Sequence, residues 1–257
     1  MIRLLSTDFD GTLVDHFAHT PVDPEFFQAL QNLRERGTLW AVNTGRSVYH
    51  ISEGLEEFHF PLHPDFVLTN EREVFRAGNT RKKWEDYGDW NLRCTLAHAE
   101  LFTKSGPIFE KISEYLSRET SAELIFEDKF PVGVVASDDE EMDRIVEFIE
   151  QERVDIPNFH YQRNTIYLRF CHRDYHKGAA LGELARLLEI SREEIFAVGD
   201  HLNDLSMLDG RFATFSACPS NSVEPVKEVV RAAGGYVAKG ACSAGVLEAM
   251  RHFGMTD

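Results

Sequence analysis

The N-terminal segment places two carboxylates directly after a mostly apolar stretch. The stretch Ile2–Thr7 is followed by Asp8-Phe9-Asp10-Gly11-Thr12. The apolar pattern predicts a buried strand, so Asp8 and Asp10 leave its carboxyl end together and a Gly-Thr turn follows. Ligands of open α/β sheets bind at this edge. Two acidic side chains so close together are costly without a cation between them, so the pair predicts a magnesium site with a nucleophilic carboxylate.

Strand and helix patterns alternate in the first and last parts of the chain. We expect strands at Ile2–Thr7, Leu39–Asn43, Phe66–Thr69 and Ile195–Val198, and helices at Pro24–Arg36, Val48–Glu57 and Gly178–Leu188. Apolar residues recur at helical spacing in the helices, and the strands are continuous apolar runs. This alternation predicts an α/β fold with a parallel, doubly wound sheet.

The middle of the chain has a different pattern. Short paired strands are expected in the hairpins Glu73–Tyr87 and Phe159–Phe170 and at Ala122–Glu127 and Val132–Ser137, with a helix at Asp139–Glu152. Neighbouring strands at this spacing are typical of a small antiparallel α+β module. The pattern therefore predicts that the middle third of the chain is inserted into one α/β core.

Composition limits the partners that the chain can have. The 257 residues carry a formal net charge of −16, which repels nucleic acid and anionic membranes. No apolar run approaches the roughly 18 to 20 residues that span a bilayer, and the start lacks a signal peptide pattern, so we expect a cytoplasmic protein. The cysteines form no CxxC pair, which favours reduced thiols. We expect a small phosphorylated metabolite as partner, no nucleic acid or membrane, and a monomer or weak homodimer.

Four segments that carry chemistry end predicted core strands or begin predicted core helices. They are Asp8-x-Asp10-Gly11-Thr12, Thr44-Gly45-Arg46, Lys177, and Gly199-Asp200-x-x-Asn203-Asp204. Each lies where a parallel sheet presents its carboxyl edge. Together they supply what phosphoryl transfer needs: a nucleophile, a metal site to neutralise phosphate oxygens, hydrogen-bond donors, and an acid for the leaving oxygen. Each segment alone is weak evidence, but the ordered set is specific.

The ordered set resembles the haloacid dehalogenase-like phosphohydrolases, and within them the Cof-type and sucrose-phosphatase-like branch. The resemblance covers nearly the whole chain, and the insertion falls between the second and third motifs. It implies a Rossmannoid catalytic core at 1–77 and 174–257, with an α+β cap at 78–173 that sets substrate specificity. It also implies Mg²⁺-dependent hydrolysis of a small phosphomonoester, with a sugar phosphate as the best guess.

The resemblance assigns roles to individual residues. Asp8 is implied to be the nucleophile that forms an aspartyl-phosphate, and Asp10 the general acid and then the base for water. Thr44 would donate to a phosphoryl oxygen, and Lys177 would neutralise charge on the phosphoryl group and on Asp8.

The same resemblance implies a set of metal ligands and substrate contacts. Asp8, the backbone carbonyl of Asp10, and Asp200 would bind Mg²⁺, with Asp204 supporting the metal and Lys177. Substrate contacts are expected from Gly11, Gly45, Arg46 and Asn203.

Weaker candidates lie outside the four motifs. Asn70 matches the first position of an Asn-Gly-Ala turn common in the family, but Asn70-Glu71-Arg72 stands here. The basic run Arg81-Lys82-Lys83 would meet an anionic substrate or form a solvated hairpin. Arg163, Asn164 and Arg169 are candidates for contacts with the leaving group.

Two other functions use similar residues. A non-enzymatic phospho-acceptor of the receiver type also has an aspartate, a hydroxyl residue and a lysine, but the chain is about twice the expected length. A phosphomutase or phosphotransferase would share every residue named above. The sequence does not separate hydrolysis from transfer.

Overall fold

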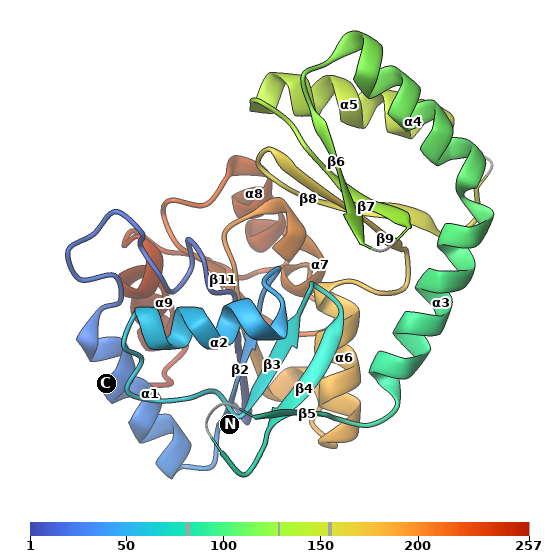
Figure 1. Ribbon diagram of the computed structural model, residues 1–257. Coiled ribbons are helices and arrows are strands. Elements are labelled where there is room, and N and C mark those ends of the chain that lie inside the picture. Colours follow the sequence, from blue (N-terminus) through green and yellow to red (C-terminus); the bar gives the residue numbers. More distant parts are fainter. Residues whose placement is uncertain (81–82, 128, 154–155, 257) are drawn as a thin grey trace. The chain divides into compact units, whose positions relative to one another are not determined.

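The computed structural model describes residues 1–80, 83–127, 129–153 and 156–256 (Figure 1). The chain forms two compact units. The core unit comprises Met1–Asn91 and Lys177–Asp257, and the inserted unit comprises Leu92–His176.

The core unit is built on one large sheet. Its strand order is β12-β11-β10-β1-β2-β3-β4-β5, parallel from β12 to β3 and antiparallel at β4 and β5. The described strands are β1 (Leu4–Thr7), β2 (Leu39–Asn43), β3 (Phe66–Thr69), β4 (Glu73–Ala77), β5 (Trp84–Asp86), β10 (Ile195–Val198), β11 (Phe215–Cys218) and β12 (Tyr236–Val237). Buried runs such as Leu4–Thr7 are what a sheet covered on both faces requires.

Helices cover the sheet in the manner of a doubly wound fold (Figure 1). They are α1 (Pro24–Glu35), α2 (Val48–Glu57), α6 (Lys177–Leu187), α7 (Leu205–Leu208), α8 (Glu224–Ala232) and α9 (Cys242–His252), with 3₁₀ turns at Arg192–Glu194 and Leu202–Asp204. Asp23 begins α1 because its side chain accepts the Glu25 N–H, and Phe26 and Leu30 point into the core. The predicted α/β fold with a parallel sheet is confirmed.

The inserted unit is an antiparallel α+β module. Its sheet has the order β6-β7-β9-β8. The strands are β6 (Glu123–Glu127), β7 (Phe130–Val135), β8 (Phe159–Asn164) and β9 (Tyr167–His172); α3 (Trp90–Lys104) runs into the unit from the core unit, and α4 (Gly106–Glu119) and α5 (Asp139–Glu152) complete it. The apolar face of α5, including Met142, Ile145 and Ile149, is buried with strand residues in a separate core.

The boundaries of the insertion differ from the expected 78–173. The structure places the change of unit at Leu92 and Lys177. Residues 84–86 belong to the core sheet because Phe75 of β4 pairs with Asp86 of β5, and the Trp84 indole packs against the core. The antiparallel hairpin therefore extends the parallel sheet instead of starting the cap.

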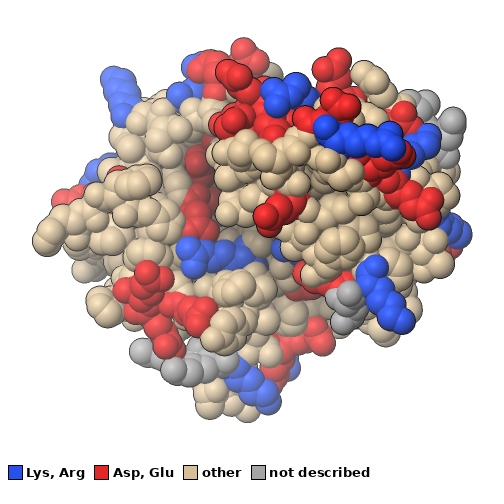
Figure 2. Space-filling model, turned by 45° about the horizontal axis from the view of Figure 1, so that its top comes forward, with Lys and Arg blue, Asp and Glu red and all other residues tan. Residues whose placement is uncertain are grey.

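None of the helices in the described part of the chain combines the length and apolar character that a bilayer crossing needs. The surface is acidic, with 43 Asp and Glu against 27 Lys and Arg in the sequence. Figure 2 shows acidic side chains spread over the displayed face, with basic ones between them.

Candidate active site

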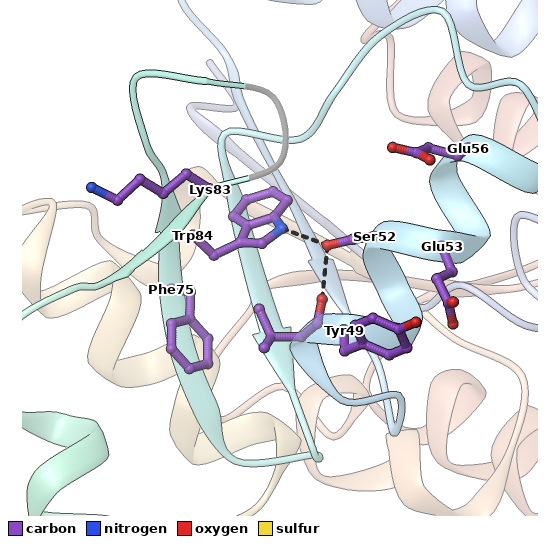
Figure 3. A pocket seen from close by; sticks show the side chains of 8 residues that line it. Tyr49, Ser52, Glu53, Glu56, Phe75, Lys83 and Trp84 are labelled. Atoms are coloured by element: carbon purple, nitrogen blue, oxygen red, sulfur yellow. Dashed lines mark hydrogen bonds between the residues drawn. The ribbon is translucent and has the colours of Figure 1, made fainter.

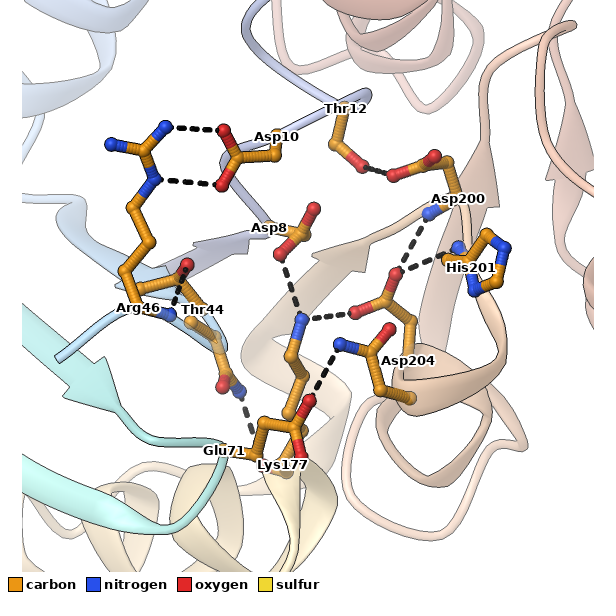
Figure 4. A network of polar contacts seen from close by, with 12 residues as sticks. Asp8, Asp10, Thr12, Thr44, Arg46, Glu71, Lys177, Asp200, His201 and Asp204 are labelled. Atoms are coloured by element: carbon orange, nitrogen blue, oxygen red, sulfur yellow. Dashed lines mark hydrogen bonds and ion pairs between the residues drawn. The ribbon is translucent and has the colours of Figure 1, made fainter. Parts of the chain in front are cut away.

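The four motifs meet at one edge of the core sheet (Figure 4). Thr7, the last residue of β1, pairs with Val42 on β2 and with Val198 on β10, so these three parallel strands end at the same level. The residues that follow the strands include Asp8, Thr44 and Asp200, and Lys177 begins α6. Parallel pairing thus brings together groups that are far apart in the sequence.

Lys177 lies at the centre of the network. Its ammonium donates to Asp8 Oδ1 across 2.7 Å and to Asp204 Oδ1 across 2.6 Å, and its side chain is fully buried. Burial alone would lower the pKa of Lys177, but the charges of Asp204, Asp8 and Glu71 raise it above the usual value. Lys177 therefore stays protonated in the folded protein.

Asp204 has both oxygens engaged. Oδ1 accepts from Lys177, and Oδ2 accepts the backbone N–H groups of Asp200 and His201, each at 2.9 Å. This carboxylate therefore orients Lys177 and the loop that carries Asp200. That arrangement fits the supporting role that the resemblance implies for Asp204.

Asp8 and Asp200 are buried carboxyls in an acidic environment. Burial raises the pKa of Asp8 well above its usual value, against the opposing charge of Lys177. Burial and the charge of Asp204 raise the pKa of Asp200 to about 7. Both shifts are what carboxyls buried beside other carboxyls are expected to have.

The donor set fits a hard divalent cation. One oxygen from each of Asp8, Asp200 and Asp204 lies within 4.8 Å of the others. Carboxylate oxygens are the ligands that Mg²⁺ prefers, and a bound cation would relieve the raised pKa values of Asp8 and Asp200. The Thr12 hydroxyl donates to Asp200 Oδ1 across 2.6 Å and so holds that carboxylate in place.

Gly11 is required by the close approach of the first and fourth motifs. Its φ of +77° is a left-handed conformation, and a Cβ at this position would lie 2.5 Å from Asp200 Oδ2. Any side chain would displace the Asp200 carboxylate. Gly11 is predicted to contact substrate, but the lack of space beside Asp200 is by itself a reason for glycine at this position.

Asp10 is held by a different set of contacts. Arg46 donates from Nε to Asp10 Oδ2 across 2.8 Å and from Nη2 to Oδ1 across 2.7 Å, and His16 lies 2.7 Å from Oδ1. Although burial opposes it, these hydrogen bonds lower the pKa of Asp10. The Arg46 guanidinium also lies over the Phe9 ring, 5.0 Å from its centroid. Arg46, predicted to contact substrate, thus contacts the predicted general acid.

Thr44, Gly45 and Asn203 lie in the same part of the site. Thr44 Oγ1 accepts the Arg46 N–H across 3.1 Å, which fixes the turn after β2. Asn203 is buried, and its Nδ2 donates to Glu71 Oε1 across 2.8 Å. Asn70 instead donates to Glu73 on β4 across 2.9 Å.

Sequence reasoning missed two residues of this network, Glu71 and His16. A signal existed for Glu71, because it stands where the family turn has glycine. His16 follows the first motif in an irregular segment, and no pattern in the sequence marks it.

The remaining candidates make contacts within their own units. Arg163 pairs with Asp139 and Asp143 on α5, so it stabilises the inserted unit. Arg169 lies 3.8 Å from Glu127 in the same unit. Arg81 and Lys82 fall outside the described residues, and Lys83 pairs with Glu85 at 3.2 Å.

A hollow of about 600 Å³ lies between α2 and the β4–β5 hairpin (Figure 3). The Trp84 indole donates to Ser52 Oγ across 2.9 Å, and the Ser52 hydroxyl donates to the Val48 carbonyl. The described residues that line the hollow include none of the acidic cluster or of the four motifs. The candidate active site is therefore identified by its acidic cluster and the four motifs, and not by the size of a hollow.

Comparisons with known proteins agree with this geometry. The family model for haloacid dehalogenase-like hydrolases matches residues 5–70 and 98–250. The phosphoglycolate phosphatase of Metallosphaera sedula is 25% identical over 229 residues, covering 89% of this chain and 90% of that protein. The 5-amino-6-(5-phospho-D-ribitylamino)uracil phosphatase of Bacillus subtilis is 24% identical over 259 residues, covering 98% and 96%.

A solved structure shares the whole fold. The sucrose-phosphatase of Synechocystis sp. PCC6803 superposes with a TM-score of 0.69 over 99% of both chains, at 18% identity. The chain belongs to the haloacid dehalogenase-like hydrolases, as its four motifs predict. The more specific prediction, a phosphatase of this family, is confirmed as well.

Proposed function

We propose that this phosphatase is a Mg²⁺-dependent phosphomonoesterase that acts on a small sugar phosphate through an aspartyl-phosphate on Asp8. The observation that carries the proposal is the buried Lys177 ammonium between Asp8 and Asp204. It holds one oxygen of Asp8 and its charge opposes the effect of burial on that carboxyl, so it favours the ionised form that a nucleophile needs.

In the first step, an Asp8 oxygen attacks phosphorus and the bond from phosphorus to the ester oxygen breaks. Asp10 gives its proton to the departing alkoxide. In the second step, Asp10 takes a proton from water, whose oxygen attacks phosphorus and displaces the Asp8 carboxylate. Inorganic phosphate leaves, and Asp8 and Asp10 return to their starting states.

The other groups of the site act on the charge of the phosphoryl group. Lys177 and the Thr44 hydroxyl would stabilise its oxygens, as preorganised donors do in phosphoryl transfer. Asp8, Asp200 and the Asp10 carbonyl would hold Mg²⁺, which when bound neutralises part of the phosphate charge. Because Arg46 and His16 stabilise the ionised form of Asp10, Asp10 must leave these contacts and take up a proton from water before it donates to the leaving oxygen.

A sugar phosphate is the favoured substrate class because of charge. The chain is strongly acidic, and its site gathers four carboxylates close to one another and to Lys177, namely Asp8, Asp200, Asp204 and Glu71. A substrate whose only anionic group is its phosphate meets less repulsion than one with a second anionic group. The names of two similar proteins, a sucrose-phosphatase and a phosphoribitylaminouracil phosphatase, support hydroxyl-rich substrates.

The test is phosphate release from a panel of sugar phosphates, phosphoglycolate and nucleotides, with Mg²⁺ and with EDTA. We expect turnover with Mg²⁺, none with EDTA, and preference for sugar phosphates over phosphoglycolate. Preference for phosphoglycolate would contradict the substrate class. Transfer of phosphate to an added sugar, in place of release, would favour a phosphotransferase.

A further inference from the structure

The turn between β3 and β4 contains an unusual residue at Glu71. Asn70 and Glu71 have φ values of 49° and 65°, and the Arg72 N–H donates to the Thr69 carbonyl across 2.9 Å. Two consecutive left-handed residues closed by this bond form a type I′ turn, which favours Asn-Gly. Glutamate at the second position is strained, because its Cβ is crowded in that conformation.

The side chain of Glu71 is also in an unfavourable place. The residue is only 7% exposed, and its Oε2 is buried without a hydrogen-bond partner among the described residues. A buried carboxylate oxygen without a partner costs free energy. Neither the backbone conformation nor the burial of Glu71 therefore stabilises the fold, and strained residues of this kind cluster at functional sites.

Glu71 nevertheless connects the two loops that carry predicted phosphate contacts. Its backbone N–H donates to the Thr44 carbonyl across 3.1 Å, and its Oε1 accepts from Asn203 Nδ2 across 2.8 Å. Its side chain lies over Gly45, where a Cβ would be 3.2 Å from Oε1. The turn after β2 and the loop after β10 are thus joined through one residue, by its backbone N–H and its carboxylate.

The Asn203 amide depends on this contact for its orientation. Its Oδ1 is buried and has no hydrogen-bond partner among the described residues. An amide group has two N–H donors on one nitrogen, so the bond to Glu71 uses one and leaves the second available. The carboxylate fixes which end of the amide faces Glu71.

We propose that Glu71 is a positioning residue for phosphoryl transfer: it orients the Asn203 amide so that its remaining N–H meets a phosphoryl oxygen. This inference rests on the proposed function, because it requires a phosphoryl group at Asn203. Glu71 acts through Asn203 and the Lys177 network, and takes no part in bond making or breaking.

Two substitutions and a matched control separate this role from a structural one. Glu71→Gly gives the turn its preferred residue and removes the acceptor. Glu71→Gln keeps an oxygen that can accept from Asn203. The control is Glu189→Gly, because Glu189 also has a left-handed φ, 54°, but is exposed and follows α6.

The full-length variants are compared for kcat, KM, Tm and the affinity for inorganic phosphate with Mg²⁺ by calorimetry. Relief of backbone strain should raise the Tm of Glu189→Gly by about 2 to 4 °C with kcat unchanged. Glu71→Gly should lower kcat at least about tenfold, the scale typical for loss of an orienting partner, without a fall in Tm. Glu71→Gln should recover most of that loss.

A kcat equal to the wild-type value in Glu71→Gly would overturn the proposal. So would a lowered Tm in Glu71→Gly together with an equal loss of kcat in Glu71→Gln. A wild-type protein without phosphatase turnover would refute the proposed function separately. If the wild type shows no turnover, the affinity for inorganic phosphate tests the positioning role of Glu71. Weaker binding in Glu71→Gly than in Glu189→Gly supports its positioning role, and equal binding rejects it.

Discussion

The Lys177 ammonium lies 2.7 Å from Asp8 Oδ1, although 169 residues separate the two in the chain. The register of β1 with its parallel neighbours and the start of α6 bring them together. The lysine is fully buried and is paired with Asp204 as well. Buried charges persist only when they are paired, so this contact ties the folding of the core to the chemistry of the site.

Lys177→Met should damage both stability and activity. Removing one partner of a buried ion pair leaves uncompensated carboxylates and costs about 3 to 5 kcal/mol of unfolding free energy. Phosphate release should fall at least about 100-fold, because a preorganised cation is lost. Adding Asp204→Asn should recover part of the stability and none of the activity. Recovery of activity in the double variant would contradict the role given to Lys177.

Asp8→Asn should abolish turnover and keep the fold. The amide is not a nucleophile, so phosphate release should fall at least about 10³-fold. The Tm should stay equal or rise, because a buried carboxyl with a raised pKa is removed. Circular dichroism and thermal melting check the fold, and a colorimetric phosphate assay checks activity. Activity near the wild-type rate in a clean preparation would rule out Asp8 as nucleophile.

Asp10→Ala and Asp200→Ala should differ in metal affinity. Asp10 is expected to offer its backbone carbonyl, which alanine keeps, whereas Asp200 is expected to offer its side chain. Isothermal calorimetry with Mg²⁺ should therefore show a much larger loss of affinity for Asp200→Ala. Equal losses in the two variants would contradict this division of roles.

The pKa of Asp200 predicts how pH affects the metal-free protein. A pKa of about 7 in the folded state, against 3.8 ordinarily, means that folding favours the protonated form. Its contribution to stability is present below about pH 4 and is lost as pH rises to 7. Asp200→Asn should therefore raise the Tm in EDTA at pH 8 and remove the Tm increase that Mg²⁺ gives the wild type. An unchanged Mg²⁺ effect would exclude Asp200 as a ligand.

Glu141 predicts the opposite pH dependence in the inserted unit. Its carboxylate accepts the backbone N–H groups of Ser121 and Ser137, each at 2.8 Å, which lowers its pKa to about 2. Stability from this lowered pKa is present above about pH 4.5 and is lost as pH falls through 2. The Tm difference between wild type and Glu141→Gln should therefore be largest at pH 7 and shrink by pH 3. Glu140→Gln, at an exposed neighbour, should show no such difference.

The sequence predicted those parts of the protein that depend on local hydrophobic patterns and on the order of strands and helices along the chain. Apolar runs and strand–helix alternation indicated the parallel sheet, and parallel strands must end at one edge, so Asp8, Thr44 and Asp200 could be placed together. The β4–β5 hairpin was recognised, but not its attachment to the core sheet. The pairing of a strand at a sheet edge depends on tertiary contacts that no local pattern encodes. One such contact here is the hydrogen bond from the Trp84 indole to Ser52.

The network around the motifs could not be predicted for a similar reason. Asn203 and Glu71 are 132 residues apart, and their hydrogen bond depends on how two loops meet. The contact of His16 with Asp10 likewise depends on the path of an irregular segment. A motif predicts the role of a single residue, but it does not predict which other side chains hold that residue in position.

The central claim is that Asp8 carries the phosphoryl group during turnover. Its most direct test is to quench the enzyme during turnover of a sugar phosphate with Mg²⁺ and to reduce it with borohydride, which converts an aspartyl-phosphate to homoserine. Peptide mass spectrometry should then find homoserine at position 8 in the wild type and not in Asp8→Asn. Turnover with an unmodified Asp8, or with the modification at another carboxylate, would contradict the account.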